Sequence, residues 1–194
     1  MKKILVFILA VASVFTMFSC SGEDDGLKAF TKAVDATSPA VIEVNTTMTT
    51  VEGELKSQST TTFNEDGSFT LAYWYEQFNT SASGVSEELI TKIEKTVTCD
   101  KDGNYSDGGA LADSTTATTG HKLGLDAKKI TYKISEDGTV LTATVKANNT
   151  KAVFGVEIAA DVTLVVTKNA DAVVSFTMNY ALEAGTVKVV CNYK

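Results

Sequence analysis

The chain has 194 residues, about the length of one domain once a targeting segment is set aside. Its 17 basic residues are all Lys, and 24 acidic residues outnumber them, so the formal net charge is −7. Phosphate binding needs a basic face and usually uses the guanidinium fork, so this composition argues against a nucleic-acid partner. A hydrophobic content of 44% with a single Pro favours a folded, strand-rich domain.

The first 19 residues resemble a secretory signal peptide. Two lysines precede an uncharged stretch, residues 4–18, which is shorter than the roughly 20 apolar residues needed to span a bilayer. The stretch ends in MFSC, residues 17–20, which resembles the bacterial lipobox. The resemblance implies cleavage just before Cys20 and acylation of this residue, so that palmitate-like chains anchor the protein to a membrane. The alternative is an ordinary signal peptide that happens to contain a Cys.

This interpretation divides the chain into a signal peptide (1–19), a lipidated Cys20 with an acidic tether (20–26) and a single domain (27–194). It predicts a protein of the bacterial cell envelope, on the periplasmic or the extracellular face of a membrane. The tether sequence SGEDDG either resembles the acidic surface-export signals of some bacterial groups or is a solvated linker.

One short amphipathic helix is predicted over residues 27–36, because Leu27, Phe30 and Val34 recur at helical spacing and Pro39 follows. Beyond it, alternation of apolar and polar residues with a period of two predicts strands joined by short polar turns. The predicted strands cover residues 41–51, 54–63, 68–78, 129–135, 139–147, 153–168, 172–183 and 186–193.

Three acidic turns that end in Gly, at 64–67, 100–103 and 135–138, predict hairpins between these strands. The stretch 87–97 fits either a helix turn or a strand, because its apolar spacing changes along its length. Residues 106–120 are rich in Ser, Thr, Gly and Ala, which predicts a loop.

A helix followed by eight or nine antiparallel strands predicts a mainly β fold, a curved antiparallel meander that forms a half-barrel or, alternatively, a closed barrel. Three segments resemble unnamed bacterial lipoproteins with the LolA-like half-barrel fold of lipoprotein carriers. They are NEDGSFTLAYWYEQFN, ISEDGTVLTATVK and GTVKVVCNYK. The resemblance implies a sheet wrapped around helices and, by analogy, a bound lipid or small apolar ligand. No catalytic motif accompanies it.

Catalytic and metal-binding chemistry have few candidates in this chain. His121 is the single imidazole, and its position in a Gly/Thr-rich stretch favours a solvated loop residue. Asp100 and Asp102 resemble the start of a calcium loop, but Gly falls fourth instead of sixth and no Glu follows at position twelve. We therefore expect no enzymatic activity, no cofactor and no metal, with a hydrolase as a remote alternative.

Cys99 and Cys191 are the two thiols that remain once Cys20 is acylated. Outside the cytoplasm two Cys residues are usually paired, so a disulfide between them is one hypothesis. Two independent buried thiols are the alternative, with nearly equal weight.

Aromatic residues are the candidates for lining a ligand cavity on the concave face of the sheet. Tyr73 and Tyr75 share one face of their strand, whereas Trp74 points to the opposite face. Ordinary core filling is the competing interpretation, because large aromatics dominate core energetics in most proteins. The candidate ligand-lining residues are Tyr73, Trp74, Tyr75, Phe78, Phe176 and Tyr180.

These observations predict a non-enzymatic lipoprotein that contacts a membrane through its acyl chains. Its expected partner is a lipid ligand or a protein that the sequence does not identify. The alternative function is a surface or periplasmic adhesion or structural module without a ligand cavity.

Overall fold

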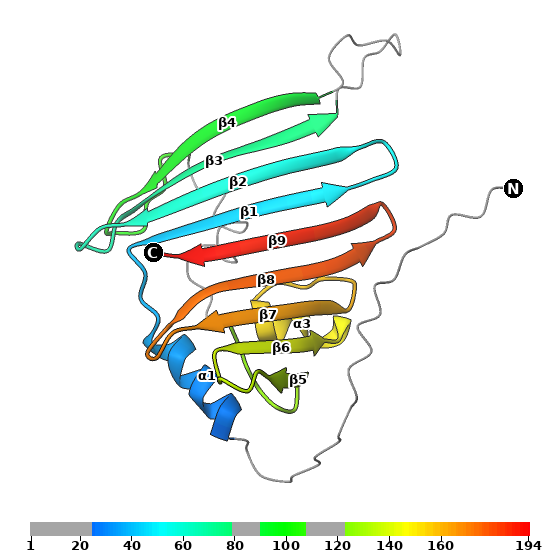
Figure 1. The fold of residues 1–194 in the computed structure, drawn as a ribbon. Coiled ribbons are helices and arrows are strands. Elements are labelled where there is room, and N and C mark those ends of the chain that lie inside the picture. Colours follow the sequence, from blue (N-terminus) through cyan, green and yellow to red (C-terminus); the bar gives the residue numbers. More distant parts are fainter. Residues whose placement is uncertain (1–24, 79–89, 108–122) are drawn as a thin grey trace, which may run out of the picture.

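The computed structural model describes residues 25–78, 90–107 and 123–194 (Figure 1). The described residues form one nine-stranded antiparallel sheet with helices on one of its faces. In chain order the elements are α1 (Asp25–Ala36), β1 (Val41–Thr49), β2 (Glu54–Phe63), β3 (Phe69–Phe78), β4 (Ile90–Cys99), β5 (Ile130–Ile134), β6 (Val140–Val145), the 3-10 helix η1 (Ala147–Asn149), α3 (Thr150–Phe154), β7 (Val162–Lys168), β8 (Val173–Leu182) and β9 (Gly185–Tyr193).

The strand order in the sheet is β4-β3-β2-β1-β9-β8-β7-β6-β5 (Figure 1). Neighbouring strands follow one another in the chain at every position except the centre, where β1 pairs with β9. β4 and β5 are consecutive in the sequence, yet they form the two outer edges of the sheet. The fold is therefore an open meander, a half-barrel as predicted, and the closed-barrel alternative is wrong.

The two faces of the sheet differ in chemistry because successive side chains point to opposite sides. The inner face carries Leu141, Leu164 and Phe176, and the first two of these are fully buried. The outer face carries Thr142 and Thr177 at the neighbouring positions of the same strands. This alternation of apolar inner and polar outer residues is typical of antiparallel sheets with one covered face.

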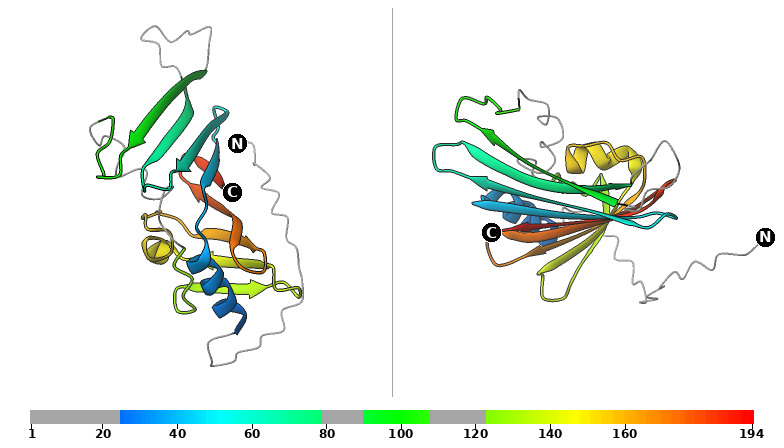
Figure 2. Two further views of the ribbon diagram at one scale, coloured as in Figure 1. Left: turned by 90° about the vertical axis from the view of Figure 1, so that its left-hand side faces the viewer. Right: turned by 90° about the horizontal axis from the view of Figure 1, so that it is seen from above.

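Helix α1 covers the inner face near β8, and α3 lies on the same side of the sheet (Figures 1 and 2). The apolar face of α1 is buried, with Phe30 only 1% exposed. The hydroxyl of Thr37, just beyond the helix, accepts a hydrogen bond of 2.9 Å from the backbone N–H of Val173 at the start of β8. The predicted helix over 27–36 is therefore confirmed, and it begins two residues earlier.

The predicted acidic turns are present, and each has a Gly with positive φ at its fourth position. In the turn between β5 and β6, the Asp137 carboxylate accepts hydrogen bonds from the hydroxyls of Ser135 (2.6 Å) and Thr139 (2.8 Å). Gly138 follows with φ of +70°, a backbone conformation that residues with a Cβ rarely adopt. The Asp–Gly pair thus forms the tight turn that antiparallel neighbours need.

One predicted strand differs from the structure, and one open alternative is decided by it. The strand predicted from residue 153 begins only at Val162, because α3 occupies the preceding stretch. There the buried Thr150 hydroxyl donates to the Ala147 carbonyl (2.8 Å) and accepts from the Ile158 N–H (2.9 Å), which stabilises a local helical turn. The ambiguous stretch 87–97 forms strand β4 from Ile90 onward. The predicted loop 106–120 lies mostly outside the described residues.

Candidate functional site

The inner face has two halves, and the one formed by β2, β3 and β4 lies away from both described helices (Figure 2). Tyr73 and Tyr75 of β3 stack in this half, with ring centroids 6.3 Å apart and ring planes at 9°. On β4, Lys95 lies opposite Tyr73 and Ile93 lies opposite Tyr75. Both tyrosine side chains are half-buried. This row presents flat aromatic surface beside one apolar and one cationic side chain.

A second aromatic group lies at the other end of the same three strands. Phe69 of β3 packs against Phe63 of β2, with centroids 6.0 Å apart, and edge-on against Tyr105, with centroids 5.9 Å apart. Next to it, Leu71 is buried and pairs with Thr61 of β2. The Thr61 hydroxyl is buried without a hydrogen-bond partner, which is rare and costs free energy. This end of the inner face is therefore largely apolar, whereas around the stacked tyrosines β2 contributes polar residues, Ser59 opposite Tyr73 and Ser57 opposite Tyr75.

Trp74 lies on the outer face, as its position between the two tyrosines predicts. Its indole N–H donates a 2.9 Å hydrogen bond to the side-chain oxygen of Gln58 on β2. The Lys92 ammonium of β4 lies 4.5 Å from the centre of the indole ring, a cation–π contact. Trp74 is next to Tyr73 and Tyr75 in the sequence, but it lies on the opposite face of the sheet.

The other candidate ligand-lining residues lie elsewhere. Phe176 is 9% exposed and belongs to the helix-covered core, where its ring lies 6.0 Å from that of Tyr193. Tyr180 lies near the end of β8 and is half-buried, and burial raises the pKa of its hydroxyl. The backbone of Phe78 pairs with Ile90, whereas its side chain lies outside the description. The six aromatic candidates therefore do not form one cavity.

The hypothesis of a disulfide between Cys99 and Cys191 is wrong in this structure, where both thiols are free and buried. Cys99 ends β4 and Cys191 lies on β9, so three strands separate the two strands that carry them. Four strand spacings of about 4.8 Å far exceed the roughly 7 Å limit between the Cα atoms of a disulfide. Burial raises the pKa of the Cys191 thiol to about 12, which keeps it protonated and unreactive.

No group of three or more His, Cys, Asp or Glu residues suited to a metal occurs within residues 25–78, 90–107 and 123–194. In the calcium-like loop, the Asp100 carboxylate already accepts hydrogen bonds from the backbone N–H groups of Asp102 and Asn104, both at 2.9 Å. These bonds hold the pKa of Asp100 below its usual value, with the Asn104 side chain as the largest cause. The loop is explained by its own turn chemistry. His121 lies outside the described residues.

The residues of the lipobox-like motif, including Cys20, also lie outside the described part of the chain. Among the helices that the structure describes, none has the length and apolar character to cross a membrane.

Comparisons with known proteins identify no family for this chain. No protein-family model matches the sequence, and no curated protein matches it. Among solved structures, LprF from Mycobacterium bovis aligns over 87% of this chain and 91% of its own, with 11% sequence identity and a TM-score of 0.41. A redesigned β barrel, b11L5F_LGL, aligns over 84% of this chain and 96% of its own, with 13% identity and a TM-score of 0.23. At these scores neither similarity bears on function.

Proposed function

We propose that the chain is a non-enzymatic lipoprotein of the bacterial cell envelope, anchored through Cys20, that binds a lipid or another small apolar ligand on its inner face. The site is the inner face of β2, β3 and β4. The observation that supports the proposal most is the stacked pair Tyr73 and Tyr75, which lies on the half of the face away from both described helices.

The chemistry of this half suits an apolar ligand with a polar head. Aromatic rings and the Ile93 side chain supply apolar contact area, whose burial contributes about 25 cal/mol per Å². Lys95, exposed and opposite Tyr73, supplies a cation for a carboxylate or phosphate head group. Ligand sites commonly combine a mostly apolar lining with a few such polar groups.

The proposed anchor places this domain close to a membrane. Helix α1 begins at Asp25, five residues after Cys20, and five extended residues span at most about 17 Å. The lipidated residue would therefore hold α1 within that distance of the lipid surface. A ligand that originates in the membrane then needs only a short path to the sheet.

The anchor is tested by Cys20→Ala, because acyl chains on this thiol are what would hold the protein on the membrane. We expect the variant to appear in the soluble envelope fraction, whereas the parent sediments with membranes. Cys99→Ala is the matched control and should sediment with membranes like the parent. If Cys20→Ala still sediments after a high-salt wash, the lipoprotein proposal fails.

The ligand site is tested with a fluorescent fatty acid titrated into the purified protein. We expect the parent to bind, and a Tyr73→Ala/Tyr75→Ala double variant to bind at least tenfold more weakly because the aromatic platform is gone. Trp74→Ala is the matched control, since it removes a neighbouring aromatic residue from the outer face. Absence of binding by the parent would favour the adhesion or structural module, and equal losses in both variants would refute this site.

A further inference from the structure

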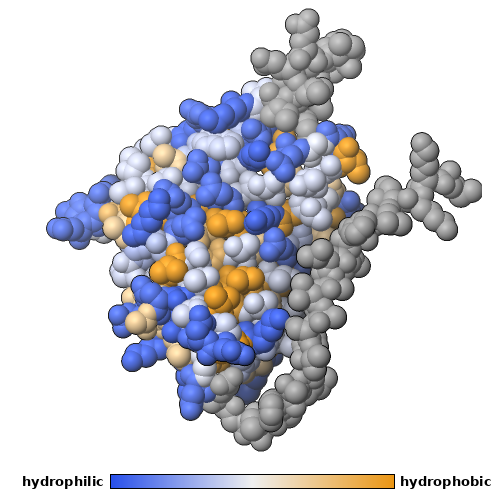
Figure 3. All heavy atoms as spheres, viewed as in Figure 1, coloured by the Kyte–Doolittle hydropathy of each residue, from blue (hydrophilic) through white to orange (hydrophobic). Residues whose placement is uncertain are grey.

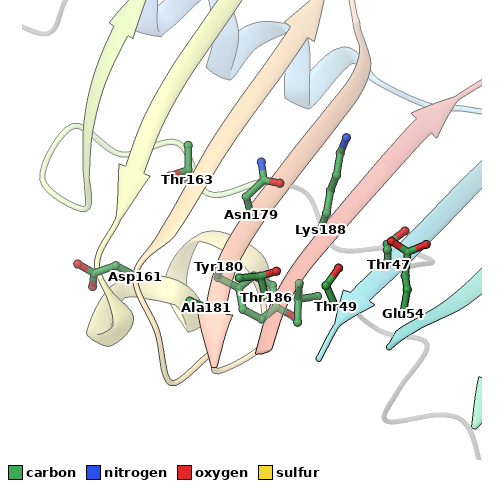
Figure 4. A pocket seen from close by; sticks show the side chains of 11 residues that line it. Thr47, Thr49, Glu54, Asp161, Thr163, Asn179, Tyr180, Ala181, Thr186 and Lys188 are labelled. Atoms are coloured by element: carbon green, nitrogen blue, oxygen red, sulfur yellow. The ribbon is translucent and has the colours of Figure 1, made fainter. Parts of the chain in front are cut away.

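Two of the hollows in the surface of the domain differ in what surrounds them. The outer face of the sheet is mostly blue and pale in Figure 3, with orange residues scattered over it. A hollow of about 700 Å³ lies on this face, and its lining includes Thr47, Asn179 and Lys188, which are ordinary water-facing residues of an open sheet (Figure 4). The other hollow, of about 550 Å³, lies between α1 (residues 27–35) and the segment 125–128 that leads into β5. We call it the α1 cleft.

The two walls of the α1 cleft are held together above an apolar floor. Leu27 and Leu125 form this floor, and each is only 6% exposed. The Thr31 hydroxyl donates to the Leu27 carbonyl at 3.1 Å and lies 3.3 Å from the Leu125 carbonyl, so it connects the helix to the facing segment. Next to Leu125, the Gly124 N–H donates to the Val153 carbonyl of α3 at 2.9 Å. The segment is therefore fixed on both sides.

The rim of the α1 cleft carries charges of both signs. Its cations are Lys28, Lys32 and Lys128, and its carboxylates are Asp35 and Asp126. Among the residues that the structure describes, the ammonium groups of Lys32 and Lys128 make no ion pair. The Asp126 carboxylate accepts a 2.8 Å hydrogen bond from the Lys128 backbone N–H and has acceptor capacity left. Cations beside carboxylates suit a ligand that itself carries both charges.

The α1 cleft lies next to the point where the chain leads to the expected membrane anchor. It begins at Leu27, and α1 starts at Asp25, at the lower end of the domain in Figure 1. The five residues from Cys20 to Asp25 span at most about 17 Å. With the anchor of the proposed function, on which this inference rests, the cleft stays close to the lipid head groups around Cys20. A short flexible link gives an effective concentration of about millimolar, so individually weak contacts suffice.

Phospholipid head groups differ in the charges that they would offer to this rim. Phosphoethanolamine carries a phosphate and a primary ammonium two carbons apart. The phosphate suits lysine ammonium groups and the ammonium suits a carboxylate, and both contacts are charge-assisted hydrogen bonds. A choline head group has no N–H to donate. A glycerol head group leaves a net negative charge, which a chain of charge −7 repels.

We propose that the α1 cleft binds the phosphoethanolamine head group of a membrane phospholipid. Lys32 and Lys128 bond to the phosphate, and Asp126 accepts from the ammonium. The glycerol backbone rests on the floor of Leu27 and Leu125, and the acyl chains stay in the bilayer. Since α1 lies on the inner side of the sheet, this contact turns the helix-bearing side of the half-barrel toward the membrane (Figure 2).

The test uses the lipidated protein, isotope-labelled for NMR, in lipid nanodiscs that contain a spin-labelled lipid. Amide signals broaden where the protein approaches the label. Residues 27–35 follow the anchor in the chain and lie near the surface in any case, so the signals of residues 125–128 decide. In discs of phosphatidylcholine with phosphatidylethanolamine, we expect them to broaden at least threefold more than in phosphatidylcholine alone. Discs with phosphatidylglycerol should not reproduce this increase.

A charge-matched pair of variants tests the residues. Lys32→Met/Lys128→Met keeps the side-chain lengths but removes two charges, and it should lower the broadening to the level seen in phosphatidylcholine. Lys101→Met/Lys133→Met removes two charges from exposed lysines outside the cleft and should broaden like the parent. The inference is overturned if ethanolamine head groups give no increase, if phosphatidylglycerol gives a larger one, or if the control loses as much. Signals that are equal in all lipids, and that change when the acidic residues of the tether (20–26) are neutralised, would place the tether in the cleft and also overturn it.

Failure of this inference and failure of the proposed function give different results. If the protein stays on the discs through Cys20 without any ethanolamine dependence, the cleft assignment is wrong and the anchor stands. If the protein does not associate with the discs, the anchor is wrong and the inference falls with it. Fatty-acid binding at Tyr73 and Tyr75 should be unchanged in Lys32→Met/Lys128→Met, because neither substitution touches β2, β3 or β4.

Discussion

Replacement of Trp74 by Ala measures how much a half-buried aromatic residue on the outer face contributes to stability. The indole loses a 2.9 Å hydrogen bond to Gln58, and such a bond contributes about 0.5–1.5 kcal/mol net. It also loses the Lys92 ammonium 4.5 Å above its ring, a contact that contributes about 0.5–1 kcal/mol at exposed sites. The sum predicts a loss of about 1–2.5 kcal/mol in the free energy of unfolding. A Trp in the core would cost about 3–5 kcal/mol.

Equilibrium urea denaturation checks this magnitude. Far-UV circular dichroism is the signal of choice, because Trp74 is the sole Trp and its fluorescence disappears with the substitution. Trp74→Phe keeps a ring for Lys92 but removes the N–H, so it should cost only the hydrogen-bond part. In a double-mutant cycle, Trp74→Ala and Gln58→Ala should couple, since the two residues contact each other. A loss above about 3 kcal/mol, or zero coupling, would refute the outer-face placement.

Three further predictions concern the core, the thiols and the turns. Phe30→Ala should lower the free energy of unfolding by about 3–5 kcal/mol, because this side chain on the buried face of α1 is only 1% exposed. In the same urea titration, the control Lys32→Ala should change the free energy of unfolding by less than about 0.5 kcal/mol. Iodoacetamide should modify Cys191 only after unfolding, because its pKa of about 12 leaves almost no thiolate; rapid labelling of the native protein, read by mass spectrometry, would contradict this. Hydrogen bonds, above all from the Ser135 hydroxyl, lower the pKa of Asp137, so the stability that they contribute is present at neutral pH and lost as the pH falls through the folded-state pKa. Asp137→Asn should therefore lower the melting temperature at neutral pH and show a smaller further decrease in acid than the parent does.

Local signals in the sequence predict the local structure well. The helix over residues 27–36 and the turn at Gly138 are both present, because spacing along a helix and the φ of a turn are decided by neighbouring residues. The alternation along β3 likewise predicts that Tyr73 and Trp74 lie on opposite faces, and the hydrogen bond from Trp74 to Gln58 agrees. Alternation with a period of two is enough to assign faces within one strand.

Relations between distant segments are not predicted by the same signals. Nothing in the spacing of Cys99 and Cys191 reveals that three strands lie between their own, because strand order depends on the pairing of β1 with β9 across the whole chain. The pairing of Asn179 with Lys188 is not predicted for the same reason. Each residue is an ordinary polar position of its own strand, and only the register brings the two together.

The sheet stays open between its edge strands β4 and β5, and the amphipathic helix in the sequence helps to explain why. Closing the meander would require these consecutive strands to pair, and a closed barrel of about eight strands has an interior only wide enough for side chains. An α-helix with its side chains is about 10–12 Å across, so α1 and α3 cannot both lie on the inner face of a small closed barrel. The buried apolar face of α1, with Phe30 at its centre, therefore favours the half-barrel over the barrel. The helices cover the inner face beside β8 and, among the described residues, do not extend to β2, β3 and β4, where the stacked tyrosines lie.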